Sequence, residues 1–431
     1  MIKKILYIIL FLVSEISSAE VKELTSSYGI KFWYSQDDSA PLINVAIAFR
    51  NCGAAHMEST KRSVPYLYTS TVLCGCGKYS KEEFQEKLQN ISAKLYCGDN
   101  LDDVTFFCKY PKIVSDEAIN LLLLALSSPK FEKKEVEENK SYISYRLRNY
   151  QDSPVSWYVH VMMPKVLFKN HPYGDGFGNS EEALNLNKND LETFHKKYIV
   201  RNNIEFCIFG DISETEAIKL ADQILSSIPK GGKAQDNIPD IEPSLKNFNE
   251  KYHIERPQSY VLFTLPNALE NSEQKFAASI LYLILGGRHF KSKIMKKLRS
   301  ELGLIYGGGI KKIENKHSCF GVGVLQTSNK NTDTTISEIK FILKQLRENG
   351  ISQEELDFAK SNMKGTFLVN LRTSEDLCHF YMTKKLHRCS EKALEEFLKG
   401  IDSVTLDQVN SFAQKNLDEK NIPFVVIGGN E

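Results

Sequence analysis

The sequence predicts an α+β protein built from two related halves, each with helices packed on an antiparallel sheet. Three observations lead to this fold class. Apolar stripes at helical spacing alternate with short β-rich runs along the chain. One helix-then-strand pattern occurs twice, and a segment without periodicity lies between the two copies. At 431 residues the chain also exceeds what a single core usually supports.

The repeat joins residues Leu186 to Asp211 with Val404 to Gly429. Phe194 matches Phe412 and Gly210 matches Gly428, and all matched pairs are separated by 218 positions. Each copy has an amphipathic helix, a polar turn and a buried strand that ends at glycine. Chance agreement of short patterns is the alternative, but a register that never slips over a whole unit favours duplication.

Segments with helical periodicity alternate with strand-like segments in each half. Helices are expected at Lys81 to Ser92, Glu132 to Tyr150, Ile336 to Asn349 and Gln353 to Leu371, and strands at Ile43 to Phe49, Thr105 to Lys109, Tyr260 to Leu265 and Phe320 to Leu325. This interleaving favours helices on antiparallel sheets. Residues 229–247 are rich in proline, glycine and charge, which predicts a linker between domains 20–228 and 248–431.

The first 19 residues have the pattern of a cleavable secretory signal. Lys3 and Lys4 precede an apolar run from Ile5 to Val13, and small residues lead to Ala19. An uncleaved anchor is the alternative, although the run is only about half of the ~20 residues that a spanning helix needs. We therefore expect an exported, periplasmic protein whose mature part has no membrane span.

Composition narrows the classes of partner. Lys plus Arg number 55 against 54 Asp plus Glu, so no basic surplus is available for nucleic acid. Nine cysteines suit an exported chain if some of them pair, but sequence cannot assign the pairs and an odd count leaves one over. Cys74 and Cys76 lack the second cysteine pair that a closed structural zinc site usually has.

Several motifs, taken in order, resemble the insulinase or pitrilysin-type zinc peptidases (family M16), which include the mitochondrial processing peptidase and small paired bacterial enzymes. These motifs are Gly75 to Ser80, Phe131 to Pro154, His171 to Asp175 with Gly178, Leu285 to Gly287, Arg299 to Tyr306 and Gly350 to Leu356. The resemblance covers nearly all of residues 21–431. It implies two homologous α+β domains that close like a clamshell.

The zinc motif of that family is lost here. Active members resemble one another in a helical His-x-x-Glu-His, in which two histidines four apart bind zinc and the glutamate takes a proton from the metal-bound water. The matching positions hold Tyr66, Thr69 and Ser70. The family's third ligand, a glutamate on a later helix, aligns with Tyr145 or Arg146, and Pro65 is expected to break the start of the metal helix. We expect this chain to bind no metal, with zinc supplied by a partner subunit.

The family's second functional element is retained. The resemblance implies that Arg299 and Tyr306 reach the substrate, because a guanidinium offers a planar fork to a peptide carbonyl and a tyrosine hydroxyl can donate to the developing oxyanion. Gly307 and Gly308 would let an extended peptide approach the strand closely. The alternative is ordinary structure, with Arg299 capping a helix end and Tyr306 a half-buried strand aromatic.

The histidines outside these motifs are expected to be structural. His56 with Glu58 lies in a loop and lacks companion ligands, and His171 belongs to a proline-glycine turn. His195 is placed on the polar side of its helix and given no role. The segment that contains Cys378, His379, His387 and Cys389 alternates with basic residues, which predicts a solvated helix face.

Three functions remain open at this stage. The leading hypothesis is the non-catalytic subunit of an exported two-subunit zinc peptidase, inactive alone and active with a homologous partner that carries the zinc motif. The second is a peptide-binding or assembly protein that takes no part in hydrolysis. The third, an autonomous metallopeptidase with atypical ligands, is disfavoured because all three ligand positions are lost. Whether the chain counts as an enzyme therefore depends on its partner.

Overall fold

The computed structural model describes residues 20–149, 152–245, 248–269, 272–287 and 291–429. The predicted signal at 1–19 lies outside this set. The described residues divide into two compact units. The first contains those of 20–145, 177–237 and 366–395, and the second those of 146–176, 238–365 and 396–429. No helix within the described ranges is long and apolar enough to cross a membrane.

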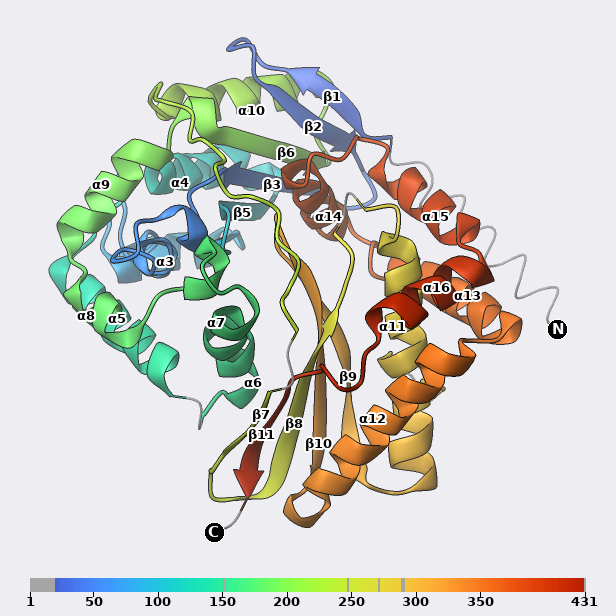
Figure 1. Cartoon of the computed structure of the whole chain (residues 1–431). Coiled ribbons are helices and arrows are strands. Elements are labelled where there is room, and N and C mark those ends of the chain that lie inside the picture. Colours follow the sequence, from blue (N-terminus) through green and yellow to red (C-terminus); the bar gives the residue numbers. More distant parts are fainter. Residues whose placement is uncertain (1–19, 150–151, 246–247, 270–271, 288–290, 430–431) are drawn as a thin grey trace. The chain divides into compact units, whose positions relative to one another are not determined.

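The first unit is a six-stranded sheet with helices on both faces (Figure 1). Its strands run in the order β1-β2-β6-β3-β5-β4. They span Lys22–Thr25 (β1), Lys31–Gln36 (β2), Leu42–Phe49 (β3), Lys94–Asp99 (β4), Val104–Pro111 (β5) and Ile204–Gly210 (β6). Its helices are α2 (Val64–Thr71), α3 (Lys81–Asn90), α4 (Ser115–Ser127), α5 (Lys133–Arg148), α8 (Ser180–Asn185), α9 (Lys188–Tyr198), α10 (Glu214–Ser227) and α14 (Ser374–Leu386).

The second unit has a five-stranded sheet in the order β7-β11-β8-β10-β9. The strands span Asn249–Tyr252 (β7), Arg256–Pro266 (β8), Ile305–Glu314 (β9), Cys319–Ser328 (β10) and Phe424–Gly429 (β11). Its helical elements are α6 (Pro154–Trp157), η3 (Tyr158–Met162), α7 (Met163–Leu167), η4 (Pro172–Asp175), α11 (Lys275–Gly286), η6 (Met295–Glu301), α12 (Thr332–Asn349), α13 (Gln353–Val369), α15 (Ala393–Ser403) and α16 (Leu406–Asn416). α5, α13 and α15 run across the unit boundaries.

The structure confirms the predicted fold class and the duplication. The strand order β2-β6-β3-β5-β4 in the first sheet corresponds place by place to β7-β11-β8-β10-β9 in the second. Helices α9 and α16 have the same length and lie at the predicted offset, and both begin with a complete capping box, at Asn187 and Thr405. The matched glycines that follow, Gly210 and Gly428, both have a positive φ, at 131° and 143°.

Each sheet is antiparallel except for one pair. β2 pairs with β6 in parallel, and β7 pairs with β11 in parallel. The neighbouring pairs β3–β6 and β8–β11 are antiparallel and in long register. The parallel pair has the same place in both sheets, as expected for two copies of one ancestral unit.

The predicted helices and strands are all present, with boundaries that differ by a few residues. Residues 229–245 contain no helix or strand, which agrees with the linker composition. The compact units, however, do not coincide with the two sequence halves. Segment 146–176 belongs to the second unit, and segment 366–395 belongs to the first.

This exchange is explained by the apolar sheet faces that the two segments cover. In the first unit, α14 lies on β3 and β6 and buries Tyr381 against Trp33 and Phe209, with ring centroids 5.8 Å and 5.6 Å apart (Figure 1). In the second, the Tyr158 hydroxyl lies 2.9 Å from Thr264 Oγ1 of β8. A sheet with two apolar faces needs helices on both, and each half supplies the second cover to the other's unit.

The position of α14 corrects one prediction. The segment around Cys378 and His379 is not a solvated face. Cys378 is buried, with Sγ 4.0 Å from the Cys207 carbonyl, and Lys385 is 9% exposed with its ammonium over the Trp33 ring. Lysine buries its aliphatic stem on apolar surface while its charge finds a partner, here Glu205 at 3.4 Å. The basic residues around Cys378 therefore do not indicate a solvated face, and that prediction was wrong.

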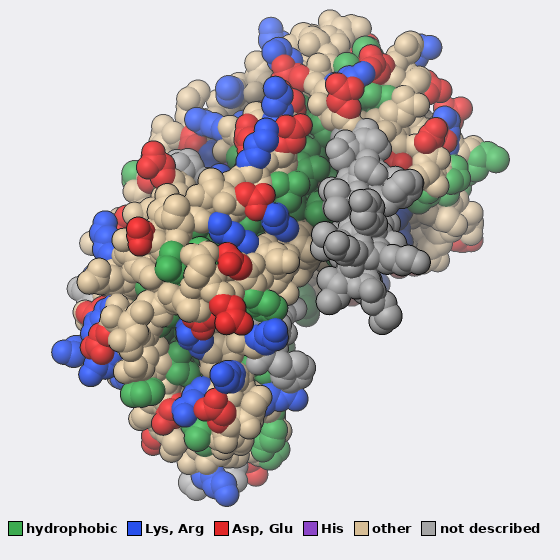
Figure 2. Space-filling model, turned by 90° about the vertical axis from the view of Figure 1, so that its right-hand side faces the viewer, with side chains coloured by type: hydrophobic (Ala, Val, Ile, Leu, Met, Phe, Trp, Pro, Cys, Tyr) green, Lys and Arg blue, Asp and Glu red, His purple; other side chains and the backbone are tan. Residues whose placement is uncertain are grey.

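All nine cysteines lie within the described residues, and no disulfide joins any two of them there. Cys108 and Cys207 are buried in β5 and β6, as predicted from their apolar runs. Burial raises the pKa of the Cys108 thiol to about 12. On the face drawn in Figure 2, acidic and basic side chains are interspersed, in keeping with the even charge balance.

Candidate functional site

The first candidate site is the helix α2, where the zinc motif would lie. Pro65 does not prevent this helix from forming, because it lies in the first turn, where its missing N–H has no intrahelical partner to lose. The expectation that it breaks the helix start was therefore wrong. The helix expected at the zinc-motif positions therefore forms, with Tyr66, Thr69 and Ser70 on it.

Those side chains make contacts typical of packing. The Tyr66 ring lies 6.2 Å from Phe177 in an edge-on arrangement. Ser70 is half-buried, and its carbonyl accepts a weak hydrogen bond from the Cys74 thiol at 3.5 Å. Tyr145 on α5 is 43% exposed. Within the described part of the chain, no group of three or more His, Cys, Asp or Glu side chains has a geometry that could hold a metal ion.

Thr69, which the resemblance aligns with the family's glutamate, faces a buried carboxyl group. Its Oγ1 donates to Asp99 Oδ1 at 2.7 Å, at the end of the edge strand β4. Burial raises the pKa of Asp99 to about 6, although the Thr69 hydrogen bond opposes this shift. The other oxygen, Asp99 Oδ2, is buried without a hydrogen-bond partner among the described residues. Sequence analysis missed Asp99, because nothing in a β-strand pattern marks a carboxylate that points inward.

His195 also lies against α2, contrary to its predicted place on a polar helix face. Its Nδ1 is 2.9 Å from the Tyr68 hydroxyl, and the Tyr68 ring packs 4.8 Å from Phe194. Burial, followed by the positive charge of Lys196, lowers the pKa of His195 to about 4. The imidazole is therefore neutral at pH 7, and its Nδ1 shares a hydrogen bond with the Tyr68 hydroxyl. A residue outside the main apolar stripe of an amphipathic helix, such as His195, is buried when a second helix packs beside that residue.

Two other histidines have the structural roles that were expected. His56 lies at the end of a short 3-10 turn with its side chain buried, and its Nε2 is 3.5 Å from Asp102 Oδ1. His171 precedes η4, where its Nδ1 accepts from the Tyr173 backbone N–H at 3.1 Å and its Nε2 lies 3.0 Å from the Pro239 carbonyl. Both side chains hold loops in place.

The second candidate site joins η6 to β9 in the second unit. Arg299 is exposed on η6, and Tyr306 is 54% exposed near the start of β9. Strand pairing explains this exposure. Gly307 opposes Gln326 and Ile305 opposes Thr327, so Tyr306 is the additional residue of a β-bulge. A bulge redirects its side chain away from the regular alternation of the strand.

Gly307 and Gly308 have different structural constraints. A Cβ on Gly308 would lie 2.2 Å from the Val324 carbonyl oxygen, and its φ is 152°. A Cβ on Gly307 would have no heavy atom within 4 Å. Gly308 is thus required for the close approach of β9 to β10, whereas the absence of a side chain at Gly307 leaves open space beside Tyr306.

β9 is the last strand of its sheet, so its outer edge has no strand partner among the described residues. Such an edge offers a row of N–H and C=O groups to which an extended peptide can add as a further strand. The role expected for Arg299, Tyr306 and the glycines stays a prediction. The bulge that exposes Tyr306 could not be predicted from the sequence, because it depends on the register with β10.

Two family models match the chain in succession. Residues 34–180 match the model described as insulinase (peptidase family M16), and residues 185–363 match the model described as the peptidase M16 inactive domain. The first match contains α2, and the second contains the Arg299–Tyr306 element. Together the two matches cover most of the chain.

Individual proteins agree with these models. The chain is 23% identical over 400 residues to the non-peptidase homolog YmxG of Helicobacter pylori, covering 91% of this chain and 90% of that protein. It is 18% identical over 418 residues to the alpha subunit of the mitochondrial-processing peptidase of Solanum tuberosum, covering 93% and 80%. These are distant similarities over nearly full length.

Solved structures show the same fold. A peptidase M16 inactive domain structure from Pseudomonas fluorescens superposes with a TM-score of 0.86 at 20% identity, covering 95% of this chain and 98% of the other. A chain of complex III2 from Candida albicans gives 0.78 at 18% identity, covering 95% and 96%. From its motifs, its duplicated sheets and both family models, the chain belongs to the M16 family of insulinase-like proteins.

Proposed function

We propose that this chain is a catalytically inactive M16 subunit, exported to the periplasm, that supplies substrate-binding and oxyanion-stabilising groups to a zinc-bearing homologous partner. One observation carries the proposal. The α2 helix is intact but has no metal ligand at Tyr66, Thr69 or Ser70, whereas Arg299 and Tyr306 remain exposed beside a free strand edge.

The retained element suits peptide binding and turnover at a metal held elsewhere. An extended peptide would pair with the outer edge of β9 through backbone hydrogen bonds, and the open space at Gly307 would admit it closely. The Arg299 guanidinium would hold a peptide carbonyl, and the Tyr306 hydroxyl would donate to the oxygen that becomes negative when water attacks. Zinc in the partner would activate that water.

The relatives' names are consistent with this proposal. The Helicobacter pylori protein is named a non-peptidase homolog, and the Solanum tuberosum protein is one subunit of a processing peptidase. Partnership and export are our proposals for this chain.

The test is reconstitution with a homologous chain from the same genome that carries His-x-x-Glu-His. We expect no hydrolysis of a quenched fluorescent peptide by this chain alone, hydrolysis by the mixture, and a loss of about 100-fold or more in kcat when Tyr306→Phe removes the donor. Arg299→Ala should raise KM. The matched control is Tyr142→Phe on α5, since Tyr142 is 52% exposed and Tyr306 is 54% exposed. Full activity of the partner alone would refute the proposal.

A second candidate is a peptide-binding or assembly protein without a part in hydrolysis, which the free edge of β9 also favours. Complex III2 contains a chain of this fold. In this case peptide affinity, measured by fluorescence anisotropy, is unchanged by a chelator, and Tyr306→Phe changes no turnover in any mixture. Loss of turnover in Tyr306→Phe with unchanged peptide affinity would exclude it.

A further inference from the structure

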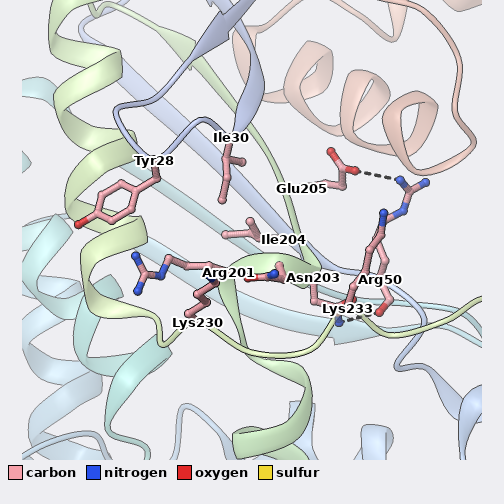
Figure 3. Close-up of a pocket in the computed structure, with 10 residues that line it drawn as sticks. Tyr28, Ile30, Arg50, Arg201, Asn203, Ile204, Glu205, Lys230 and Lys233 are labelled. Atoms are coloured by element: carbon pink, nitrogen blue, oxygen red, sulfur yellow. Dashed lines mark hydrogen bonds and ion pairs between the residues drawn. The ribbon is translucent and has the colours of Figure 1, made fainter.

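A cavity of about 550 Å³ lies in the first unit, and none of its lining residues belongs to α2 (Figure 3). It is formed by the β1–β2 turn, the start of β6 and the first residues of the predicted linker. Its lining residues are Tyr28, Ile30, Arg50, Arg201, Asn202, Asn203, Ile204, Glu205, Lys230 and Lys233. This volume is within the range of small-molecule sites.

The lining has four cations and one carboxylate. That carboxylate, Glu205, is already paired with Arg50 Nη1 at 2.9 Å and with Lys385 Nζ at 3.4 Å. Across the described residues, no ion pair engages the other three lining cations, which are Arg201, Lys230 and Lys233. In a chain with almost equal numbers of acidic and basic residues, this is a local positive surplus.

The nearby acids outside the lining are also engaged. Asp222 accepts hydrogen bonds from the Ser27 backbone N–H at 2.8 Å and the Ser27 hydroxyl at 2.6 Å, which fixes the turn that carries Tyr28. Asp236 Oδ2 lies 3.8 Å from Arg388 Nη2. Neither carboxylate is among the lining residues, so an anion that enters the cavity would meet the three lining cations.

The wall that carries the two lysines is fixed in place. The Arg201 backbone N–H donates to the Pro229 carbonyl at 2.9 Å, and the Ala234 N–H donates to Asn203 Oδ1 at 3.3 Å. Between them Gly231 lies so close to Val200 that a Cβ would be 2.5 Å from Val200 Cγ1. The backbone that carries Lys230 and Lys233 is thus fixed by these contacts, so binding of a ligand has no entropic cost for ordering this segment.

The remaining lining is apolar and aromatic. The Arg201 guanidinium lies over the Tyr28 ring, 4.9 Å from its centroid, and in Figure 3 its side chain extends toward Tyr28. Arg201 Nε is a buried donor without a hydrogen-bond partner among the described residues. Ile30 and Ile204 supply apolar surface to the cavity lining. A guanidinium stacked on a ring keeps a planar fork of donors ready for an oxyanion.

We propose that this cavity binds a small organic anion, with its phosphate or carboxylate group held by Arg201, Lys230 and Lys233 and its apolar part against Ile30, Ile204 and the Tyr28 ring. The site is independent of the proposed peptidase role. It gives the predicted linker a function, since the first linker residues supply two of the three ligand-binding cations.

The test is isothermal titration calorimetry of the purified protein at low ionic strength with phenyl phosphate, benzoate and inorganic phosphate. We expect saturable binding of phenyl phosphate or benzoate, and the tighter one assigns the anionic group. Inorganic phosphate should bind more weakly because it lacks the apolar part. Binding should weaken as salt is added.

The double variant Lys230→Gln/Lys233→Gln should bind the better probe at least about tenfold more weakly, which is about 1.4 kcal/mol. Both lysines are exposed, so folding should be unaffected, and Trp33 fluorescence checks this. The matched control is Lys133→Gln, an exposed lysine of the same unit on α5. No saturable binding of either organic probe, or equal affinity in the double variant and the control, would overturn the proposal.

Discussion

Replacing His195 by glutamine should remove much of the acid sensitivity of the first unit. His195 is packed against Tyr68 on α2, and burial lowers its pKa from 6.5 to about 4. The unfolded chain therefore takes up a proton near pH 6.5 that the folded chain does not accept until about pH 4. Stability from the neutral imidazole is complete above pH 6.5 and is lost as pH falls toward 4.

The magnitude follows from the shift. The lowered pKa of His195 corresponds to a loss of about 3 kcal/mol in the free energy of unfolding when pH falls below 4. About 2 kcal/mol of this loss develops between pH 7 and pH 5. His195→Gln keeps a side chain that can hydrogen-bond the Tyr68 hydroxyl but cannot titrate. Asp99 titrates in the same range with the opposite sign, and its effect cancels because both proteins contain it.

The assay is urea unfolding at pH 7, 6 and 5, followed by tryptophan fluorescence. The chain has two tryptophans, and Trp33 lies in the first unit while Trp157 lies in the second. A Trp157→Phe background therefore reports on the first unit alone. We expect the free energy of unfolding to fall by about 2 kcal/mol more in the parent than in His195→Gln between pH 7 and pH 5.

Tyr68→Phe separates burial from hydrogen bonding. Because burial is the largest cause of the lowered pKa, this variant should lose stability at every pH yet keep most of the parent's pH dependence. Equal pH dependence in the parent and in His195→Gln would refute the reasoning. So would a flat pH profile in Tyr68→Phe, since the hydroxyl would then be the dominant influence.

Three further outcomes are expected. Gly308→Ala should lower the free energy of unfolding of the second unit, measured in urea, by about 1–3 kcal/mol, because the added Cβ would meet the Val324 carbonyl oxygen. Gly307→Ala should change this free energy little, since a Cβ there has open space. Equal effects of the two substitutions would contradict the strand geometry. Asp99→Asn should stabilise the first unit by up to about 3 kcal/mol above pH 6, because the raised pKa of Asp99 means that its ionised form destabilises the folded state. This stabilisation should disappear as pH falls toward 3.8, where Asp99 is protonated in the folded and unfolded states. A stabilisation that grows in acid would contradict the raised pKa. Dialysis against EDTA should leave the melting temperature unchanged, and stoichiometric zinc in the purified protein by mass spectrometry would revive the autonomous metallopeptidase hypothesis.

The local elements were predictable because they depend on side-chain periodicity. The α9 and α16 helices begin at the same place in both copies, since capping at Asn187 and Thr405 is a local interaction within four residues. The absence of the zinc motif at Tyr66, Thr69 and Ser70 was likewise readable, because ligand chemistry is a property of residue type.

Side-chain environments were not predictable in the same way. His195 and Cys378 were each assigned to solvated helix faces, yet the first packs against Tyr68 and the second against β6. Both errors have one cause. A helix that is covered on two sides has buried positions outside its main apolar stripe, and only the packing of another element shows which positions these are.

The sequence by itself determined the two related α+β copies, the residue types at the positions expected for the zinc motif and the presence of Arg299 and Tyr306 in one segment. Only the tertiary structure decided that segments 146–176 and 366–395 each cover a sheet of the other half, that Tyr306 is exposed by a bulge, and that the linker lysines enclose a cationic cavity. The physical reason is range. Capping, periodicity and ligand identity act within a few residues, whereas sheet coverage, strand register and cavity charge depend on contacts between segments far apart in the chain.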